Sequence, residues 1–428
     1  MMLEKRNPIP VSEAVERVMQ FAYTEKVEKV TLAQAHGRFL ASDIVADADV
    51  PAFDRSPYDG FAIQAASSAE ASTDNPITFT IVGEIGAGYV HTTPVGPLQA
   101  VRIMTGAPIP QGCDAVVMLE LTQSHEPNTM TIKRAFASGT NISYQGEDVK
   151  KNAVLVQKGE FINPGVVALL ATFGYSEVTV YKKAVVGVIA TGSELLEPNE
   201  ALQPGKIRNS NAYTLLAQIE RAGATAKYIG KFEDDLTVCI DVVKRTLQDV
   251  DILITTGGVS VGDYDYLPAI YEALGAEVLF NKIAMRPGSV TTVAQLNGKL
   301  LFGLSGNPSA CYVGFELLTR PIIRQAYGSR RPHLRKEQAQ LGADFTKANP
   351  FTRFVRASIH FDNGQLIAVP SGFNKSSSIS SLVEADAFIV LPGGSRGYEQ
   401  GMAVDVVLLD DAKGSEWPWD NIKKSYKS

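Results

Sequence analysis

The sequence predicts a multidomain α/β protein, and three observations support this prediction. The chain has 428 residues, a length typical of two to four domains. Between Ala184 and Pro308, apolar runs of strand length alternate with helical patterns, which is typical of an open α/β sheet. The flanking segments, 77–149 and 354–409, instead carry short apolar runs separated by turn residues, so both are expected to be rich in β-strands.

The N-terminal part is expected to begin with helices and continue as strands. Ser12 is a favourable N-cap for the first helix, and a second, short helix is expected over 32–40. A third helix is expected from Pro164 to Phe173, with Gly174 as its stop. In between, the apolar runs predict strands at 77–82, 100–105, 115–120 and 131–136.

The central segment carries clear start and stop signals. Asn209 or Ser210 can cap a helix that ends near Gly223, and Pro308 stands at the first position of a later helix. The Asn-Gly pair at 297–298 predicts a β-hairpin. The remaining pattern predicts strands at 184–192, 228–229, 252–255 and 278–283, and helices at 235–247 and 266–274.

The C-terminal segment is expected to form a small β domain. A basic segment at 329–336 links it to the α/β part. The Asn-Gly pair at 363–364 predicts a hairpin, and the residues from Lys413 onward are expected to form a loose tail. Strands are expected at 354–361, 365–370, 387–392 and 403–409.

The composition is ordinary for a globular protein in a reducing compartment. The formal net charge of -6 argues against nucleic-acid binding as the main function. The three cysteines show neither metal-ligand spacing nor a disulfide framework, and five scattered histidines offer no triad. No run is apolar enough to cross a bilayer and the first ten residues contain no signal-peptide apolar core, so a cytoplasmic location without membrane attachment is expected.

The stretch from Asp251 to Tyr266 is the strongest candidate for a ligand-binding loop. An apolar strand runs into three glycines, which allow a ligand to approach the backbone closely. The helix that follows has an N-terminus that favours an anion. The alternative is a tight turn that needs glycine for its shape alone. The candidate binding groups are Gly257, Gly258, Ser260 and Gly262.

Three further loops are expected at the same edge of the sheet, where ligands bind in open α/β folds. Together the loops bring carboxylates to that edge, and such a set suits a divalent cation bound with a phosphate or another oxyanion. Lys282 and Arg286 are candidates for neutralising the anion. For each residue alone, the alternative is an ordinary polar loop. The candidates are Glu194, Asp235, Asp263 and Asp265, together with Ser305, Gly306, Asn307 and Pro308.

In the N-terminal half, Asp59 and Thr105 each stand directly before a glycine, and Asp148 lies in Q-G-E-D-V. These residues are candidates for a polar site. The alternative is that they only stabilise turns, in which such residues are common.

At these residues the chain resembles the MoeA family of molybdopterin molybdenumtransferases, which is related to the C-terminal E domain of gephyrin. Six motifs carry the resemblance, follow one another in family order and are specific as a set. They are P-A-F-D-R-S-P-Y-D-G-F-A (51–62), R-I-M-T-G-A-P-I-P-Q-G-C-D-A-V-V (102–117), Q-G-E-D-V (145–149), V-I-A-T-G-S-E-L (188–195), T-G-G-V-S-V-G-D-Y-D-Y (256–266) and G-L-S-G-N-P-S-A (303–310).

The resemblance implies an enzyme that inserts molybdenum from molybdate into adenylylated molybdopterin and releases AMP, the final step of molybdenum cofactor biosynthesis. It implies Mg²⁺ as the cation. It also implies a homodimer whose cleft joins the α/β domain of one chain to the N-terminal half of the other. The molybdopterin adenylyltransferase is a candidate partner.

The resemblance further implies a central molybdopterin-binding-type α/β domain at 183–330. An elongated N-terminal domain comprises 1–52 plus 147–182, and a β-rich domain at 53–146 is inserted into it. A C-terminal β domain covers 331–412, and 413–428 form the tail.

Carried over motif by motif, the resemblance places six acidic or hydroxyl side chains in the shared cleft. Three are predicted to hold the cation and position molybdate, namely Glu194, Asp235 (with Asp234 as the alternative) and Asp265. They face Asp59, Thr105 and Asp148. The pterin phosphate or pyrophosphate is expected at Gly257, Gly258, Ser260 and the loop from Ser305 to Pro308.

Two positions depart from the family pattern. Many members carry K-P-G-K-P where this chain has R-P-G-S-V at 286–290, so Arg286 keeps a charge with a different geometry and Ser289 removes one. Ser305 replaces a proline, which either loosens the loop or adds a hydroxyl.

Two other functions are alternatives for this sequence. An adenylylating nucleotidyltransferase could use the same loops, but the related adenylyltransferase is a much shorter single domain. A scaffold of the gephyrin type would need features that this chain lacks, such as a long linker or an extra partner domain.

Overall fold

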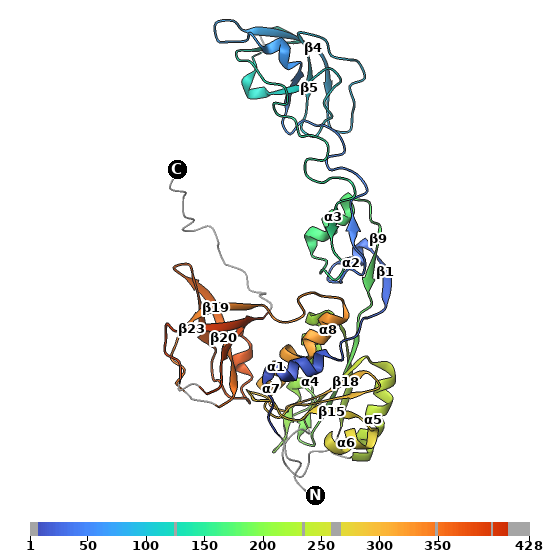
Figure 1. The fold of residues 1–428 in the computed structure, drawn as a ribbon, viewed down its shortest axis with the longest axis vertical. Coiled ribbons are helices and arrows are strands. Elements are labelled where there is room, and N and C mark those ends of the chain that lie inside the picture. The colour runs from blue at the N-terminus through green and yellow to red at the C-terminus, as the bar shows by residue number, and fades with distance from the viewer. Residues whose placement is uncertain are drawn as a thin grey trace. The chain divides into compact units, whose positions relative to one another are not determined.

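A computed structural model describes residues 7–123, 126–232, 236–257, 267–346, 350–394 and 397–409 of the chain (Figure 1). The chain divides into two compact units. The first comprises Met1–Ala41, Gly159–Asn163 and Val178–Ser428, and the second comprises Ser42–Lys158 and Pro164–Glu177. Among the helices of the described ranges, none has the length and apolar character needed to cross a membrane.

A six-stranded sheet forms the centre of the first unit. Its strands are β10 (Val185–Thr191), β13 (Thr225–Phe232), β14 (Ile252–Thr256), β15 (Glu277–Phe280), β17 (Thr292–Leu296) and β18 (Lys299–Leu304). They lie in the order β13-β10-β14-β18-β17-β15, and the first four are parallel. β17 pairs antiparallel with both of its neighbours. The predicted open α/β sheet is therefore confirmed, with an antiparallel edge.

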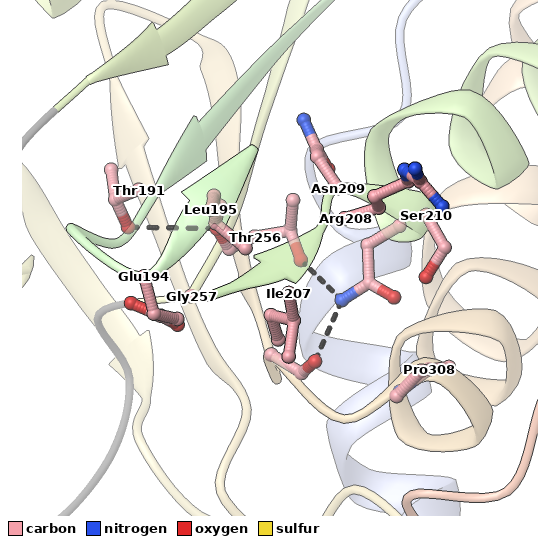
Figure 2. A pocket seen from close by; sticks show the side chains of 12 residues that line it. Thr191, Glu194, Leu195, Ile207, Arg208, Asn209, Ser210, Thr256, Gly257 and Pro308 are labelled. Atoms are coloured by element: carbon pink, nitrogen blue, oxygen red, sulfur yellow. Dashed lines mark hydrogen bonds between the residues drawn. The ribbon is translucent and has the colours of Figure 1, made fainter. Parts of the chain in front are cut away.

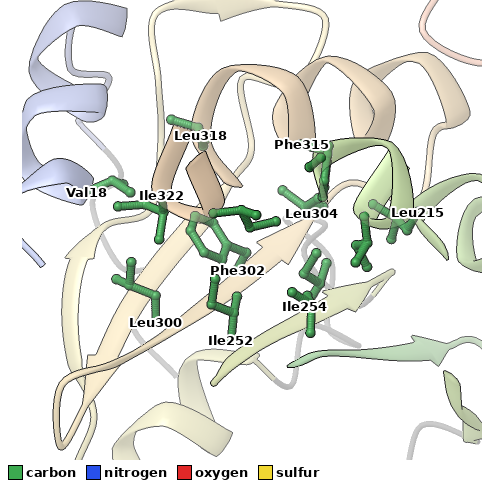
Figure 3. Close-up of a cluster of buried hydrophobic side chains, with 14 of the residues drawn as sticks. Val18, Leu215, Ile252, Ile254, Leu300, Phe302, Leu304, Phe315, Leu318 and Ile322 are labelled. Atoms are coloured by element: carbon green, nitrogen blue, oxygen red, sulfur yellow. The ribbon is translucent and has the colours of Figure 1, made fainter. Parts of the chain in front are cut away.

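Helices cover both faces of this sheet. One face packs against α1 (Val11–Met19), α4 (Ser210–Ala222), α7 (Pro308–Gly314), the π-helical turn η3 (Phe315–Thr319) and α8 (Arg320–Ala326). The other packs against α5 (Leu236–Asp249) and α6 (Leu267–Leu274). Because successive strand residues point to opposite faces, Ile252 and Ile254 join the first cluster and Leu253 joins the second. Figure 3 shows the first cluster, in which Phe302 lies between the sheet and the helices.

Local signals account for several element boundaries. The Asn209 side chain accepts a hydrogen bond from the Ala212 N–H at 3.2 Å and so caps α4, and Gly223, with φ of 97°, ends that helix. Asn297 and Gly298 have φ of 51° and 81°, as the tight hairpin between β17 and β18 requires. These predictions are confirmed.

A five-stranded barrel follows the α/β part. Its strands are β19 (Lys336–Leu341), β20 (Thr352–Asp362), β21 (Gln365–Pro370), β22 (Ala387–Leu391) and β23 (Ala403–Leu408). They pair in a closed circle, and β16 (Met285–Arg286) of the α/β part adds to β20 at its start. A short helical turn, η4 (Ser380–Leu382), precedes β22. The strand β19 was not predicted, because only Ala339 and Leu341 of its six residues are buried.

Two predictions about the N-terminal helices are wrong in detail. The first helix, α1, begins directly after Pro10, whose carbonyl accepts the Ala14 N–H at 3.0 Å, so Ser12 lies in the first turn and is not the N-cap. The second, α2 (Leu32–Ala35), ends early because the chain turns at Gly37, with φ of 80°. Next to it, β1 (Val27–Thr31) pairs with β9 (Glu177–Tyr181).

The second unit contains the predicted β-rich segment. Its five strands are β3 (Gly60–Ile63), β4 (Ile77–Ile85), β5 (Gln99–Ile103), β6 (Ala115–Met118) and β7 (Thr129–Ile132). They lie in the order β6-β3-β5-β4-β7 around a core that includes Phe61 and Phe79. Strand β3 was not predicted, because the segment around it is rich in turn residues.

The predicted third helix is confirmed as α3 (Pro164–Thr172), and β2 (Ile44–Val45) pairs with β8 (Val154–Val156). Two short helical turns complete this unit, η1 (Ala65–Ser68) and η2 (Leu119–Leu121).

Candidate functional site

A pocket of about 80 Å³ lies where the parallel strands β10, β14 and β18 end (Figure 2). Its other walls are the N-terminus of α4 and the short pair β11 (Leu195–Leu196) and β12 (Ile207–Arg208). This is the edge of the sheet at which the sequence predicts ligand binding. The lining residues are Thr191, Glu194, Leu195, Ile207, Arg208, Asn209, Ser210, Asn211, Thr256, Gly257, Gly306 and Pro308.

Two glycines bring the loops of this pocket close together. Gly257 has φ of 93°, and a Cβ atom there would lie 2.2 Å from the Thr191 carbonyl oxygen. A Cβ atom on Gly306 would lie 3.7 Å from the Gly257 Cα. At this point a ligand can therefore approach the main chain without meeting a side chain.

Asn211 joins three of the pocket's elements, and the sequence analysis missed it. Its buried Nδ2 donates to the Thr256 Oγ1 at 3.0 Å and to the Gly306 carbonyl oxygen at 2.9 Å. These bonds tie α4 to the loops after β14 and β18. The available signal was the polar run R-N-S-N directly before a helix at the ligand-binding edge of an α/β sheet.

Glu194 supplies the acidic group of the pocket. A Cβ atom on Gly192, whose φ is 148°, would lie 2.6 Å from the Glu194 Oε2, so this glycine makes room for the carboxylate. The Ile207 N–H donates to the Glu194 carbonyl oxygen at 2.9 Å and holds the residue beside β12. The carboxylate is exposed and forms no ion pair with any residue that the structure describes. It is therefore available to bind a cation.

The N-terminus of α4 and Arg208 supply positive potential. The first N–H groups of a helix have no intrahelical partner and favour an anion. Arg208 is exposed, and its guanidinium donates only a long hydrogen bond, 3.4 Å, to the Glu200 carbonyl oxygen within the described part of the chain. The pocket therefore suits an anionic ligand with a cation beside it.

Several predicted residues lie outside the described residues: Gly258, Ser260, Gly262, Asp263, Asp265, Asp234 and Asp235. Within the described ranges, no three His, Cys, Asp or Glu side chains are placed to hold a metal ion together. Of the residues predicted to bind the cation, only Glu194 lies within the part of the chain that the structure describes.

Arg286 is not among the residues that line the pocket. It lies on a different part of the unit, opposite another arginine. Strand β16 places it opposite Arg353 on β20, and burial together with Arg286 lowers the pKa of Arg353. Arg356 is 2% exposed, and burial together with Arg353 lowers its pKa to about 10. No carboxylate of the described ranges forms an ion pair with these three arginines. The Arg356 guanidinium donates to Ser381 Oγ and to the carbonyl oxygens of Phe373 and Lys375. Arg286 and Arg353 are therefore the two cations that suit an oxyanion.

The remaining predicted residues of this unit have structural contacts. The Lys282 carbonyl oxygen accepts the Ile9 N–H at 3.2 Å, and Lys282 is not a lining residue. The Ser305 hydroxyl accepts the Asn307 N–H at 3.2 Å, so the serine at this position adds a hydroxyl that stabilises the turn.

In the second unit, three of the sequence motifs converge. Arg55 forms β-bridges with both Pro108 and Ser143, and Val50 forms one with Val149. The segments 51–62, 102–117 and 145–149 are therefore neighbours, although residues 63–144 separate the first from the last.

Asp59 and Thr105 meet directly at this convergence. The Asp59 Oδ1 accepts the Thr105 N–H at 2.7 Å and the Thr105 Oγ1 hydroxyl at 2.9 Å. These two bonds hold the pKa of Asp59 below its usual value. Asp148 is exposed, and its N–H donates to the Val50 carbonyl oxygen at 3.1 Å.

Three protein-family models match the chain in order. The MoeA N-terminal region (domain I and II) matches residues 9–174, a probable molybdopterin binding domain matches 187–325, and the MoeA C-terminal region (domain IV) matches 338–409.

Full-length relatives match as well. The chain is 59% identical to the molybdopterin molybdenumtransferase of Bacillus subtilis (strain 168) over 100% of both chains. It is 51% identical to that of Staphylococcus aureus (strain COL) over 97% of this chain and 99% of the relative. The crystal structure of the molybdopterin biosynthesis MoeA protein from Pyrococcus horikoshii OT3 superposes with a TM-score of 0.81 and 31% identity, over 94% of this chain and 100% of that chain.

Proposed function

The chain belongs to the MoeA family of molybdopterin molybdenumtransferases, and from that premise we propose that it inserts molybdenum from molybdate into adenylylated molybdopterin and releases AMP. This reaction completes the molybdenum cofactor. The enzyme is a transferase of molybdenum cofactor biosynthesis.

The observation that carries the proposal is the pocket at the carboxyl edge of the sheet. Its floor is main chain at Gly257 and Gly306, and one wall is the N-terminus of a 13-residue helix. Phosphate groups bind well to such backbone and helix termini. Adenylylated molybdopterin carries two linked phosphates, so its pyrophosphate is the part that this pocket suits best.

A divalent cation, with Mg²⁺ as the candidate, would sit beside the pyrophosphate. The exposed Glu194 carboxylate at the pocket fits this role, and Asp265 with Asp235 or Asp234 would complete the oxygen ligands. When bound, the cation would neutralise the charge that grows on the phosphate as AMP leaves. The protein's own part is to hold the pyrophosphate in place and to supply the carboxylate ligands.

Molybdate is a small oxyanion and needs cationic partners of its own. Arg286 and Arg353, which stand opposite each other on β16 and β20, support a molybdate site, because neither forms an ion pair with a carboxylate of the described ranges. The guanidinium of Arg286 takes the place of the family lysine in this role.

The proposed site also includes Asp59, Thr105 and Asp148, which a partner chain would contribute in a homodimer. In this arrangement the α/β part of one chain and the N-terminal half of the other line one cleft in the cytoplasm. The support is the convergence of the motif segments that carry the three residues, together with the exposure of Asp59 and Asp148.

The first test is a coupled assay of the purified chain with adenylylated molybdopterin, Mg²⁺ and molybdate. We expect molybdate-dependent release of AMP together with activation of an apo-molybdoenzyme. Tight binding without AMP release would instead indicate a carrier protein.

A second test separates the acidic residues from the fold. Asp265→Ala and Glu194→Gln are each expected to abolish molybdenum insertion and to leave the far-UV circular dichroism spectrum unchanged. Glu220→Gln, an exposed carboxylate at the far end of α4, is the matched control and should keep wild-type turnover. Wild-type turnover in Asp265→Ala would overturn the cation assignment.

A further inference from the structure

A chain of hydrogen bonds leads from Glu197 to the first turn of α4. The Tyr228 hydroxyl donates to the Glu197 Oε1 at 2.6 Å, and the Asn209 Nδ2 donates to the Tyr228 hydroxyl oxygen at 3.1 Å. At the other end of its amide, the Asn209 Oδ1 accepts the Ala212 N–H at 3.2 Å. We call Glu197, Tyr228 and Asn209 the relay.

The carboxylate at one end dictates the direction of every bond in the relay. Because a carboxylate only accepts, the Tyr228 hydroxyl must donate to Glu197, and its oxygen is left to accept from Asn209. The NH₂ group of the Asn209 amide therefore faces Tyr228, and the carbonyl oxygen faces the helix. Burial and Glu197 raise the pKa of Tyr228, so the hydroxyl keeps its proton.

The orientation of the Asn209 amide matters because this side chain is 2% exposed. With the amide turned over, its NH₂ group would face the Ala212 N–H, and the helix would lose its cap. A buried donor without a partner is costly. The Ala212 N–H, which only donates, favours the observed orientation, and the Tyr228 hydroxyl is the acceptor that satisfies the NH₂ group in that orientation. Without the Tyr228 hydroxyl, this buried NH₂ donor would lose its partner in the relay.

The first turn of α4 is also a wall of the pocket, since Asn209, Ser210 and Asn211 all line it. We propose that Glu197, acting through Tyr228 and Asn209, is a positioning residue that holds the first turn of α4 in place for the phosphate groups of the substrate. This inference rests on the proposed function, because it assumes that the pocket binds the pyrophosphate of adenylylated molybdopterin.

The first test is Tyr228→Phe in the full chain, which removes the hydroxyl and keeps the ring. We expect the KM for adenylylated molybdopterin to rise about fivefold with kcat within about twofold, because the buried NH₂ group of Asn209 loses its acceptor and the N-cap, which contributes about 1 kcal/mol, is weakened in ground state and transition state alike. The control is Tyr213→Phe. The Tyr213 hydroxyl donates to the same carboxylate at 2.8 Å but is not part of the relay, so this variant should keep the wild-type KM. An unchanged KM in Tyr228→Phe, or an equal rise in both variants, would contradict the proposal.

The second test asks whether Tyr228 acts through the Asn209 amide. Serine caps helices about as well as asparagine and has no NH₂ group that needs an acceptor. In an Asn209→Ser background, Tyr228→Phe should therefore change KM by less than about 1.5-fold. A fivefold rise in that background as well would mean that Tyr228 acts by another route.

A third measurement does not depend on the reaction. Hydrogen–deuterium exchange of the Ala212 amide should be faster in Tyr228→Phe than in the wild type. In the Asn209→Ser background, Tyr228→Phe should leave the exchange rate of this amide unchanged. If the wild type releases no AMP, the proposed function fails while this exchange pattern still supports the relay. If exchange at Ala212 is the same in Tyr228→Phe and the wild type, the relay fails whatever the activity.

Discussion

Asp59 and Thr105 show how a single contact sets the state of a side chain. Both hydrogen bonds from Thr105 are made to the charged form of the carboxylate, and they lower its pKa from the ordinary 3.8. A carboxyl group with a lowered pKa stabilises the fold above that ordinary value and loses its contribution only as the pH falls through the lowered one. Asp59 is therefore an anion throughout the neutral range.

The first prediction concerns this contact. Thr105→Val removes the hydroxyl donor and keeps the N–H donor, so we expect the pKa of Asp59 to move part of the way back to its ordinary value. The measurement is a side-chain carboxyl titration by NMR. Thr105→Ser retains the hydroxyl and should keep the wild-type pKa. Identical titration curves for the valine and serine variants would show that the hydroxyl bond does not lower the pKa.

The second prediction concerns the backbone at Gly257. Gly257→Ala would place a Cβ atom 2.2 Å from the Thr191 carbonyl oxygen at a φ of 93°, so the loops after β10 and β14 must move apart. We expect a loss of about 2–4 kcal/mol in the free energy of unfolding, because the clash adds to about 1–2 kcal/mol of backbone strain.

The matched control is Gly298→Ala, at a similar φ of 81° but with nothing within 4 Å of the added Cβ atom. It should cost only the backbone strain, about 1–2 kcal/mol. The free energy of unfolding of both variants is measured by urea denaturation. Equal losses in the two variants would mean that the added Cβ atom at Gly257 does not clash with the Thr191 carbonyl.

At the scale of secondary-structure elements, a buried ion pair joins α4 to η3. Glu316 is 1% exposed, pairs with Arg221 of α4, and accepts a hydrogen bond from the Gln218 Nε2 at 2.7 Å. Because α4 carries one wall of the pocket at its other end, this contact holds the far end of the same helix against the sheet.

The third prediction tests this buried pair. Glu316→Ala removes the buried carboxylate that pairs with Arg221, so we expect a loss of about 3–5 kcal/mol in the free energy of unfolding. Asp249→Ala is the control, because Asp249 is 67% exposed and pairs with Lys227 at 3.1 Å on the surface. It should cost less than about 1 kcal/mol. Similar losses in the two variants by urea denaturation would show that burial does not matter here.

At the scale of the whole molecule, the proposed cleft draws on two chains. Asp59→Ala and Glu194→Ala are each expected to be inactive as homodimers. A heterodimer of the two variants would contain one cleft with both changes and one cleft with neither.

The fourth prediction follows from this arrangement. Co-expression of Asp59→Ala and Glu194→Ala should restore about a quarter of wild-type AMP release, since half of the dimers are mixed and each has one intact cleft. Co-expressing either variant with itself is the control. No activity in a purified heterodimer would mean that both residues serve a cleft built from one chain.

Much of this molecule follows from local sequence. The cap of α4 at Asn209, its end at Gly223 and the hairpin at Asn297-Gly298 could be predicted because each of these signals acts within a few residues. The errors have local causes too. Helix α1 begins at Val11, directly after Pro10, so Ser12 already lies inside it, and β19 has too few buried residues to form an apolar pattern.

The sequence by itself determined the α/β class, the β-rich flanks, the family and the loops at the ligand-binding edge. Only the tertiary structure decided which side chains meet. It joined Asn211 to Gly306, placed Arg286 beside Arg353, and connected Glu197 through Tyr228 to Asn209. Periodicity and turn chemistry are local properties that a chain carries in its order of residues. Contacts between distant residues depend on strand order and register, which arise only when the helices and strands pack together.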